Sequence, residues 1–342
     1  MVNKFDYPDY RTLRGSELCE AIAGIPSMHF DSAEDASLYF ARELDYVKGE
    51  AYDVQYPNFT ALTCFPISTD IPEGAETFTY YSYDKVGMAK VISNYATDLP
   101  RVDAKGTPHT AFVRSLGDSY GYSVQDLRAA RMAGKSLNST LAETARRQID
   151  QLTNQIAWMG DKENNLMGVL SEDNDIPLYT LSASSAKPES TKWADKTAEE
   201  ILVDINGMEA YVAKLTKDVE RPDTLLVPSD TYFDISNRQL PGTGISVMKF
   251  ILDNAPYLKS IKSAAELNDN SPETNPYASG GSPKGVALLY TNNKKKIAIE
   301  IAMPFFQYPA QARGLELIVP CESRMGGVSI YYPLSALIAV GV

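Results

Sequence analysis

Few side chains in this sequence could serve acid–base or metal chemistry. It contains two histidines, His29 and His109, so histidine-based catalysis and metal binding lack their commonest residue. The cysteines, Cys19, Cys64 and Cys321, are far apart and match neither a zinc site nor a disulfide framework. We expect three reduced thiols that serve as small apolar residues.

Carboxylate pairs suited to general acid–base work do occur, but 44 acidic residues make chance neighbours the default explanation. The pairs are Asp173 with Asp175 and Glu199 with Glu200. A Ser-His-Asp or Cys-His arrangement is improbable with two histidines, and no GxSxG motif is present. We therefore predict no catalytic residues, and a protein that is not an enzyme.

Phosphate-binding motifs are also missing. The glycine-containing runs at 241–246 (PGTGIS) and 278–285 (ASGGSPKG) match neither a P-loop nor a dinucleotide fingerprint. The run at 294–296 (KKK) could touch phosphate, but at the tip of a hairpin it is more typical of a solvated turn. The sequence thus predicts neither a cofactor nor a metal site.

The composition is that of a folded globular chain. At 342 residues the length favours about two domains, or one elaborated domain with arms. The hydrophobic fraction of 44% and the charged fraction of 22% are ordinary, which excludes a disordered or fibrous protein. A net charge of −12 argues against a protein whose main role is to bind nucleic acid. No run is apolar enough for a signal peptide or a membrane span, so we expect cytosol-like surroundings and no membrane partner.

The N-terminal third contains little self-contained structure. Residues 1–55 are expected to form an extended arm, with one amphipathic helix over about 32–46 (SAEDASLYFARELDY). Alternation predicts strands at 77–84 (TFTYYSYD) and from 110 (TAFV). Between them, 85–109 forms a long polar loop, which is either a surface insertion or a functional element.

A long helix is the strongest structural signal. Ser123 and Asp126 have capping-box spacing, which predicts a short helix to about Gly134. A longer helix ending at Gly160 follows from one apolar stripe. The stripe consists of Leu137, Leu141, Ala145, Ile149, Leu152, Ile156 and Met159. The opposite face is charged, which is typical of a rigid strut with a solvated or inter-subunit surface.

A new region begins near residue 170. Thr197 and Glu200 predict a capped helix with an apolar stripe at Ile201, Ile205, Met208, Val212 and Leu215. A strand at 224–228, a helix at 246–252 and a hairpin of strands 286–290 and 296–303 are expected to follow. The run 328–342 is apolar and β-like. Without a regular βαβ rhythm, the fold class is predicted as α+β.

Together these elements give an arm, a long loop, a rigid helix and a separate lobe. Such a chain has many surfaces to bury against copies of itself, so symmetric assembly is favoured over a pocket-based activity.

Four segments carry a family resemblance. They are TFTYYSYDKVGMAKVISNYATDLPRVD from residue 77, YGYSVQDLRAARMAGKSLNSTLAETARRQIDQLTNQIAWMGDKENNLMGVLS from 120, RPDTLLVPSDTYFDIS from 221 and GISVMKFILDN from 244. Over about residues 70–260 the chain resembles the major capsid proteins of tailed bacteriophages, which have the Hong Kong 97-like fold. The similarity is to a branch first catalogued as a domain of unknown function in phages and prophages.

The resemblance implies roles for the segments. Residues 1–55 would be the N-terminal arm. Residues 56–170 would be the peripheral domain, with the extended loop at 85–109 and the spine helix within 123–159. Residues 171–320 would form the axial domain, and 321–342 a last strand that returns to the peripheral domain.

The resemblance also implies partners. The chain would form hexamers and pentamers of an icosahedral shell that encloses double-stranded DNA, with weak, non-specific contacts to that DNA. It would be assembled in the host cytoplasm and end in the virion. Scaffolding, portal and decoration proteins are possible partners. Some relatives are crosslinked through a loop lysine, but Lys85, Lys90 and Lys105 match no such site, and we expect no crosslink.

Two other functions stay open at this stage. An encapsulin-type nanocompartment, which resembles the same fold, would enclose protein cargo instead of DNA. A cytosolic α+β enzyme would instead show a convergent polar pocket with perturbed ionisable groups.

Overall fold

The structure is a computed structural model that describes residues 59–86, 103–133, 140–278 and 284–342. The arm predicted at 1–55, its helix at 32–46, Cys19 and His29 lie outside these residues. Residues 59–342 belong to one compact unit.

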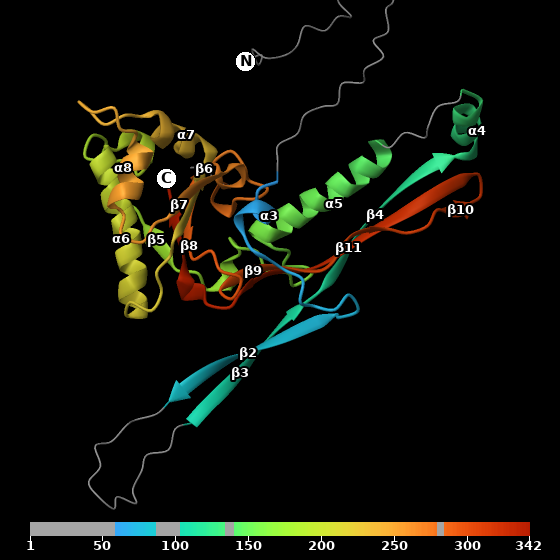
Figure 1. Ribbon diagram of the computed structural model, residues 1–342, viewed down its shortest axis with the longest axis horizontal. Helices are drawn as coiled ribbons and strands as arrows, with labels where there is room; N and C mark the ends of the chain where they lie inside the picture. The colour runs from blue at the N-terminus through green and yellow to red at the C-terminus, as the bar shows by residue number, and fades with distance from the viewer. Residues whose placement is uncertain (1–58, 87–102, 134–139, 279–283) are drawn as a thin grey trace, which may run out of the picture. The chain divides into compact units, whose positions relative to one another are not determined.

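The first sheet is built around one long strand, β11 (Glu316–Ile330). On one side β11 pairs antiparallel with β4 (Arg114–Ser123) along the whole length of β4. Its other side pairs with β10 (Gln311–Arg313) and then with β9 (Ile297–Gln307), and β1 (Ile67–Ser68) lies parallel to β9. Register shifts interrupt the β9–β11 pairing, where Gly327 has a φ of +73°. At its far end this first sheet carries β10 and the helix α4 (Val124–Ala133) (Figure 1).

Helix α5 (Thr140–Met159) covers this sheet, as the apolar stripe predicts. Ala145, Ile149 and Ile156 are buried, and Gly160 ends the helix with a φ of +76°. The prediction is wrong for Leu141 and Leu152, which are exposed. The buried face turns toward Thr153 and Asn154 near the end of the helix. Asn154 forms hydrogen bonds with Ala61 N and Glu266 on other segments, whereas Thr153 donates to the Ile149 carbonyl of α5 itself. The capping box before α4 is confirmed, since Ser123 Oγ accepts from Asp126 N at 3.0 Å.

The second sheet has the order β5-β12-β8-β6-β7. Its strands are β5 (Leu178–Thr180), β6 (Thr224–Pro228), β7 (Ser260–Ala264), β8 (Val286–Tyr290) and β12 (Ala336–Val340). Three helices pack on one face: α6 (Ala198–Thr216), α7 (Ser229–Asn237) and α8 (Val247–Asn254) (Figure 1). The capping box of α6, the buried strand at 224–228 and α8 are confirmed. Leu215, expected in the α6 stripe, is exposed.

The two sheets share one core. Along β8, Ala287 and Leu289 face the three helices, whereas Leu288 and Tyr290 belong to the same apolar cluster as α5, β9 and β11. Burial on both faces explains why all five residues of β6 and of β8 are inaccessible. Folding of the two parts is therefore energetically coupled.

Two sequence expectations about strand pairing are wrong. Strands β8 and β9 do not form the predicted hairpin, because β8 pairs with β6 and β12 while β9 pairs with β1 and β11. Residues 321–342 do not form one returning strand either: β11 ends at Ile330, and β12 joins the second sheet. Ala298 and Glu300 are as buried as Ile297 and Ile299, so alternation along β9 could not indicate its partners.

A short helix, α3 (Ala61–Cys64), joins the two parts. The ring of Phe65 meets Trp158 of α5 at 5.3 Å and Tyr290 of β8 at 5.2 Å between centroids. Glu266 Oε1 accepts hydrogen bonds from Thr60 N at 3.0 Å and from Asn154 Nδ2 at 2.9 Å. This carboxylate therefore links the start of α3, α5 and the second-sheet region.

Strands β2 (Thr77–Val86) and β3 (Asp103–Phe112) form a separate two-stranded sheet that projects from the first one (Figure 1). The predicted loop at 85–109 is therefore too long at its C-terminal end, since pairing begins at Val86 and Asp103. The sequence did not predict β3 because it contains Gly106 and Pro108, residue types that are rare inside strands. A two-stranded sheet tolerates proline, because the outer edge of each strand needs no backbone N–H donor. No helix in the described part of the chain is both long and apolar enough to cross a membrane.

Candidate functional site

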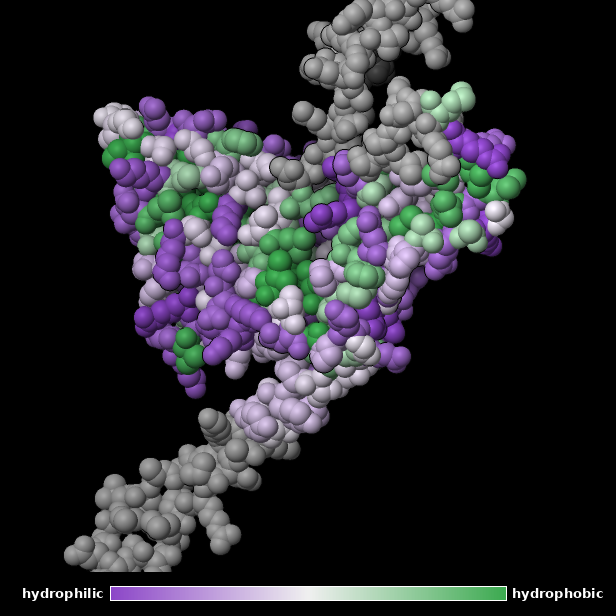
Figure 2. All heavy atoms as spheres, turned by 45° about the vertical axis from the view of Figure 1, so that its right-hand side comes forward, coloured by the Kyte–Doolittle hydropathy of each residue, from purple (hydrophilic) through white to green (hydrophobic). Residues whose placement is uncertain are grey.

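The most distinctive surface is the β2–β3 hairpin. Tyr81 and Tyr83 are 59% and 65% exposed, and their rings stack with centroids 6.3 Å apart. Alternate residues of a strand point to one face, which places both rings on the same side of the ribbon. Two large exposed aromatic side chains on a projecting ribbon are typical of a protein-binding surface. Figure 2 shows the ribbon leaving the body of the molecule.

The other face of the hairpin is held at its base. The ring of Tyr80 stacks on that of His109 with centroids 5.1 Å apart, and it packs edge to face with the ring of Tyr331 at a centroid distance of 4.8 Å. His109 Nε2 lies 3.0 Å from Ser82 Oγ, and Tyr331 donates its hydroxyl hydrogen to Glu300 Oε1 at 2.7 Å. The base of the hairpin is thus fixed to β9 and to the segment after β11.

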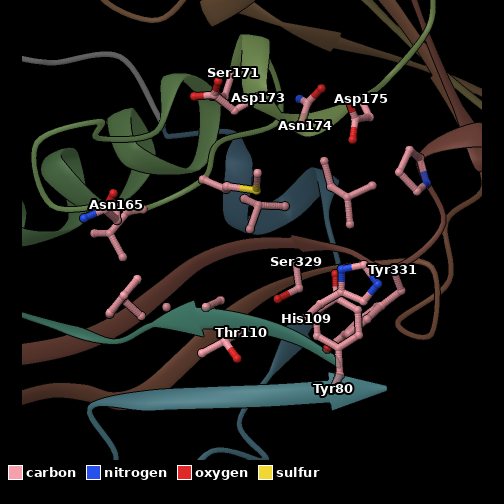
Figure 3. A pocket seen from close by; sticks show the side chains of 18 of the residues that line it. Tyr80, His109, Thr110, Asn165, Ser171, Asp173, Asn174, Asp175, Ser329 and Tyr331 are labelled. Carbon is pink, nitrogen blue, oxygen red and sulfur yellow. The ribbon is translucent and has the colours of Figure 1, made fainter. Parts of the chain in front are cut away.

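A pocket of about 700 Å³ lies beside this base. Tyr80, His109 and Tyr331 line one side, and the turn carrying Asp173 and Asp175 lines the other (Figure 3). Both aspartates are exposed and form no hydrogen bond with a described residue. This brings the predicted Asp173–Asp175 pair and His109 to one pocket, which the sequence did not indicate.

The electrostatics of the pocket do not favour catalysis. Burial raises the pKa of Tyr80, and burial together with Glu300 raises that of Tyr331, so neither phenol provides a base near neutral pH. His109 faces a serine hydroxyl and a tyrosine ring, not a carboxylate that would orient it as a general base. The pocket is lined by aromatic and acidic side chains.

The remaining chemical candidates have structural roles. Cys64 and Cys321 are buried, and burial raises the pKa of both thiols. Glu200 belongs to the α6 capping box, where hydrogen bonds from Ser185 and Thr197 lower its pKa to about 2. Glu199 is exposed on the same first turn.

The glycine-containing run at 241–246 and the first two lysines of the run at 294–296 lie on the surface. Gly242, with a φ of +76°, lies in the exposed connection between α7 and α8, and residues 279–283 fall outside the described ones. Lys294 forms an ion pair with Asp70 at 2.9 Å, and Lys296 with Glu220. Among the described residues no group of His, Cys, Asp and Glu is arranged to hold a metal ion.

Comparison with known proteins identifies the family. A family sequence model described as "Major capsid protein" matches residues 87–342. The chain belongs to this family. Among curated protein sequences, none matches.

Solved structures show that this capsid protein has the fold of phage capsids. The capsid of Myoviridae phage XM1 aligns with a TM-score of 0.70 and 15% identity, covering 88% of this chain and 98% of that one. Mycobacterium phage Bobi aligns with a TM-score of 0.58 and 15% identity, covering 92% of this chain and 100% of that one. A virus-like particle from Pyrococcus furiosus aligns with a TM-score of 0.50 and 12% identity, covering 81% of this chain and 91% of that one. The α+β class predicted from the element order and the Hong Kong 97-like fold implied by the resemblance are both confirmed.

Proposed function

We propose that this protein self-assembles through hexamers and pentamers into the icosahedral shell of a tailed phage, enclosing double-stranded DNA. One observation carries the proposal: in a chain of the major capsid protein family, the β2–β3 ribbon projects with Tyr81 and Tyr83 uncovered by any other described element. A ribbon that pairs only with itself is unstable alone, and a neighbouring subunit would supply the missing surface.

The domains follow from the two sheets. The first sheet with α4 and α5 would be the peripheral domain, with α5 as its spine helix and the hairpin as its extended loop. The second sheet with α6, α7 and α8 would be the axial domain near the capsomer centre. The shared core would hold both in one orientation during assembly.

A structural role without catalysis agrees with the buried thiols and the protonated phenols. The net charge of −12 suits a shell that contacts DNA weakly. We further propose assembly in the host cytoplasm and location in the virion, with scaffolding, portal or decoration proteins as partners. The match of residues 87–342 to the major capsid protein family model favours the phage capsid over a nanocompartment for protein cargo.

The hairpin provides the test. Replacing Tyr81 and Tyr83 by Ser should leave the subunit folded but prevent closed shells in electron micrographs. The matched control is Tyr332, which is 56% exposed and lies just after β11, outside the hairpin. Its replacement by Ser should leave shells intact. Deletion of residues 85–109 is expected to have the same effect as the double substitution. Normal shells from both hairpin variants would contradict the role given to the hairpin.

A further inference from the structure

A second hollow, of about 560 Å³, lies between α6 and the segment before β7. Asn206, Glu209, Lys214 and Lys217 line it from α6 and the residue after it, and Tyr257 lines it from the facing segment. We call this hollow the α6 notch. It shares no lining residue with the hairpin pocket.

Unpartnered acceptors distinguish the α6 notch. Glu209 is 1% exposed, and neither of its carboxylate oxygens has a hydrogen-bond partner. Asn206 Oδ1, one turn earlier on the same face of α6, also has none. Buried polar atoms are nearly always paired, so three such oxygens at one hollow indicate a missing donor.

No side chain of the described residues supplies that donor. The backbone amides of Tyr257 and Leu258 face the Glu209 carboxyl and lower its pKa. Desolvation outweighs them and raises the pKa to about 7. The charged side chains that line the notch beside Glu209 are Lys214, Lys217 and Asp218, and neither lysine forms an ion pair with Glu209. Arg221 instead lies over the ring of Tyr257, 5.1 Å from its centroid.

The surface beside the α6 notch indicates where a donor would come from. Val203, Tyr211 and Leu215 of α6 are all exposed, Val203 by 66%. Tyr211 and Leu215 are four residues apart and lie one above the other on the helix, and Val203 lies two turns earlier. We call these three exposed side chains the apolar row of α6. An exposed apolar row next to unpaired acceptors is typical of a protein interface.

We propose that the α6 notch binds a lysine or arginine side chain of a second copy of this chain, while the apolar row packs alongside. This inference rests on the proposed function, in which every subunit meets further copies. A cation would satisfy the carboxylate and the amide oxygen together, and charge-assisted hydrogen bonds are the stronger kind.

The contact would depend on pH with a definite sign. An acid with a raised pKa keeps its proton up to that pKa, so Glu209 is neutral below about pH 7 and cannot form an ion pair there. Above this pH the carboxylate is charged and the lysine or arginine still is. Assembly should therefore strengthen between pH 6 and pH 8, and Glu209→Gln should abolish this part of the pH dependence.

Sedimentation velocity on the full chain tests this proposal. At pH 8, Glu209→Gln should raise the concentration needed for self-association by about tenfold or more, the effect of one charged hydrogen bond. At pH 6 the variant should match the wild type. Glu199→Gln, an exposed carboxylate on the same helix, is the matched control and should behave as wild type at both pH values.

A second variant leaves the carboxyl in place. Leu215→Glu adds charge to the apolar row and should weaken association at both pH values, with thermal unfolding of the subunit unchanged. If Glu209→Gln associates like the wild type at pH 6 and pH 8, the notch proposal is wrong while the shell function stands. If the wild type does not self-associate at either pH, whether expressed alone or together with the products of its neighbouring genes, the proposed function fails as well.

Discussion

A buried lysine holds the loop before α6 in place, and its removal should be costly. Lys196 and Asp204 form an ion pair with side chains that are 0% and 2% exposed. Asp204 also accepts hydrogen bonds from Trp193 Nε1 at 3.2 Å and from Ser182 Oγ. Lys196→Met keeps most of the volume but leaves the carboxylate buried without its counter-charge. Breaking a buried pair in this way costs about 3–5 kcal/mol.

The same loop contains a matched control. Lys187 and Asp195 form an ion pair at 2.5 Å, but the lysine is 67% exposed. An exposed pair contributes less than about 1 kcal/mol, so Lys187→Met should change the free energy of unfolding by no more than that. Both variants can be compared by urea unfolding of the subunit, followed by the fluorescence of its two tryptophans, Trp158 and Trp193.

A double variant makes the reasoning easier to refute. Asp204→Asn added to Lys196→Met removes the uncompensated charge, so the double variant should be more stable than Lys196→Met alone. Equal losses for Lys196→Met and Lys187→Met would show that burial of the pair does not determine its energetic role. A double variant less stable than Lys196→Met would show that the cost arises from lost packing and hydrogen bonds.

Two further substitutions test the close contacts on which the fold depends. Gly168→Ala would place a Cβ 2.1 Å from the backbone nitrogen of Gly160. We therefore expect it to lower the free energy of unfolding by about 3 kcal/mol, measured by thermal unfolding. Gly74 has open space around it, so Gly74→Ala should change this free energy by less than about 0.5 kcal/mol. Glu266→Gln removes the charge that strengthens the bonds accepted from Thr60 and Asn154, and should cost about 1–3 kcal/mol, whereas the exposed Glu273→Gln should cost almost nothing. Unchanged melting of Gly168→Ala or Glu266→Gln would contradict these contacts.

Local features of the fold could be predicted from the sequence. Both capping boxes, the end of α5 at Gly160 and the buried residues of α6 depend on chemistry within a few residues. Periodicity failed where tertiary partners decide burial. Leu152 is exposed because the buried face of α5 turns toward Asn154, which pairs with Glu266, a residue 112 positions later in the sequence.

Strand partners could not be predicted, for a different reason. Residues on both faces of β8 and β9 are apolar or buried, so their pattern is compatible with more than one neighbour. The functional surfaces were equally non-local. The YYSYD run indicated a strand, but the exposure of Tyr81 and Tyr83 depends on what the rest of the chain leaves uncovered. The unpaired oxygens of Glu209 depend likewise on the facing segment around Tyr257.

The central claim is that this chain builds a shell, and one measurement tests it most directly. The chain would be expressed alone and together with the products of its neighbouring genes, then studied by negative-stain electron microscopy and sedimentation velocity. We expect closed particles or capsomer rings in at least one of the two preparations. Nucleic acid or protein inside the particles would then distinguish a phage capsid from a nanocompartment. A monodisperse monomer or dimer in both preparations would contradict the assignment.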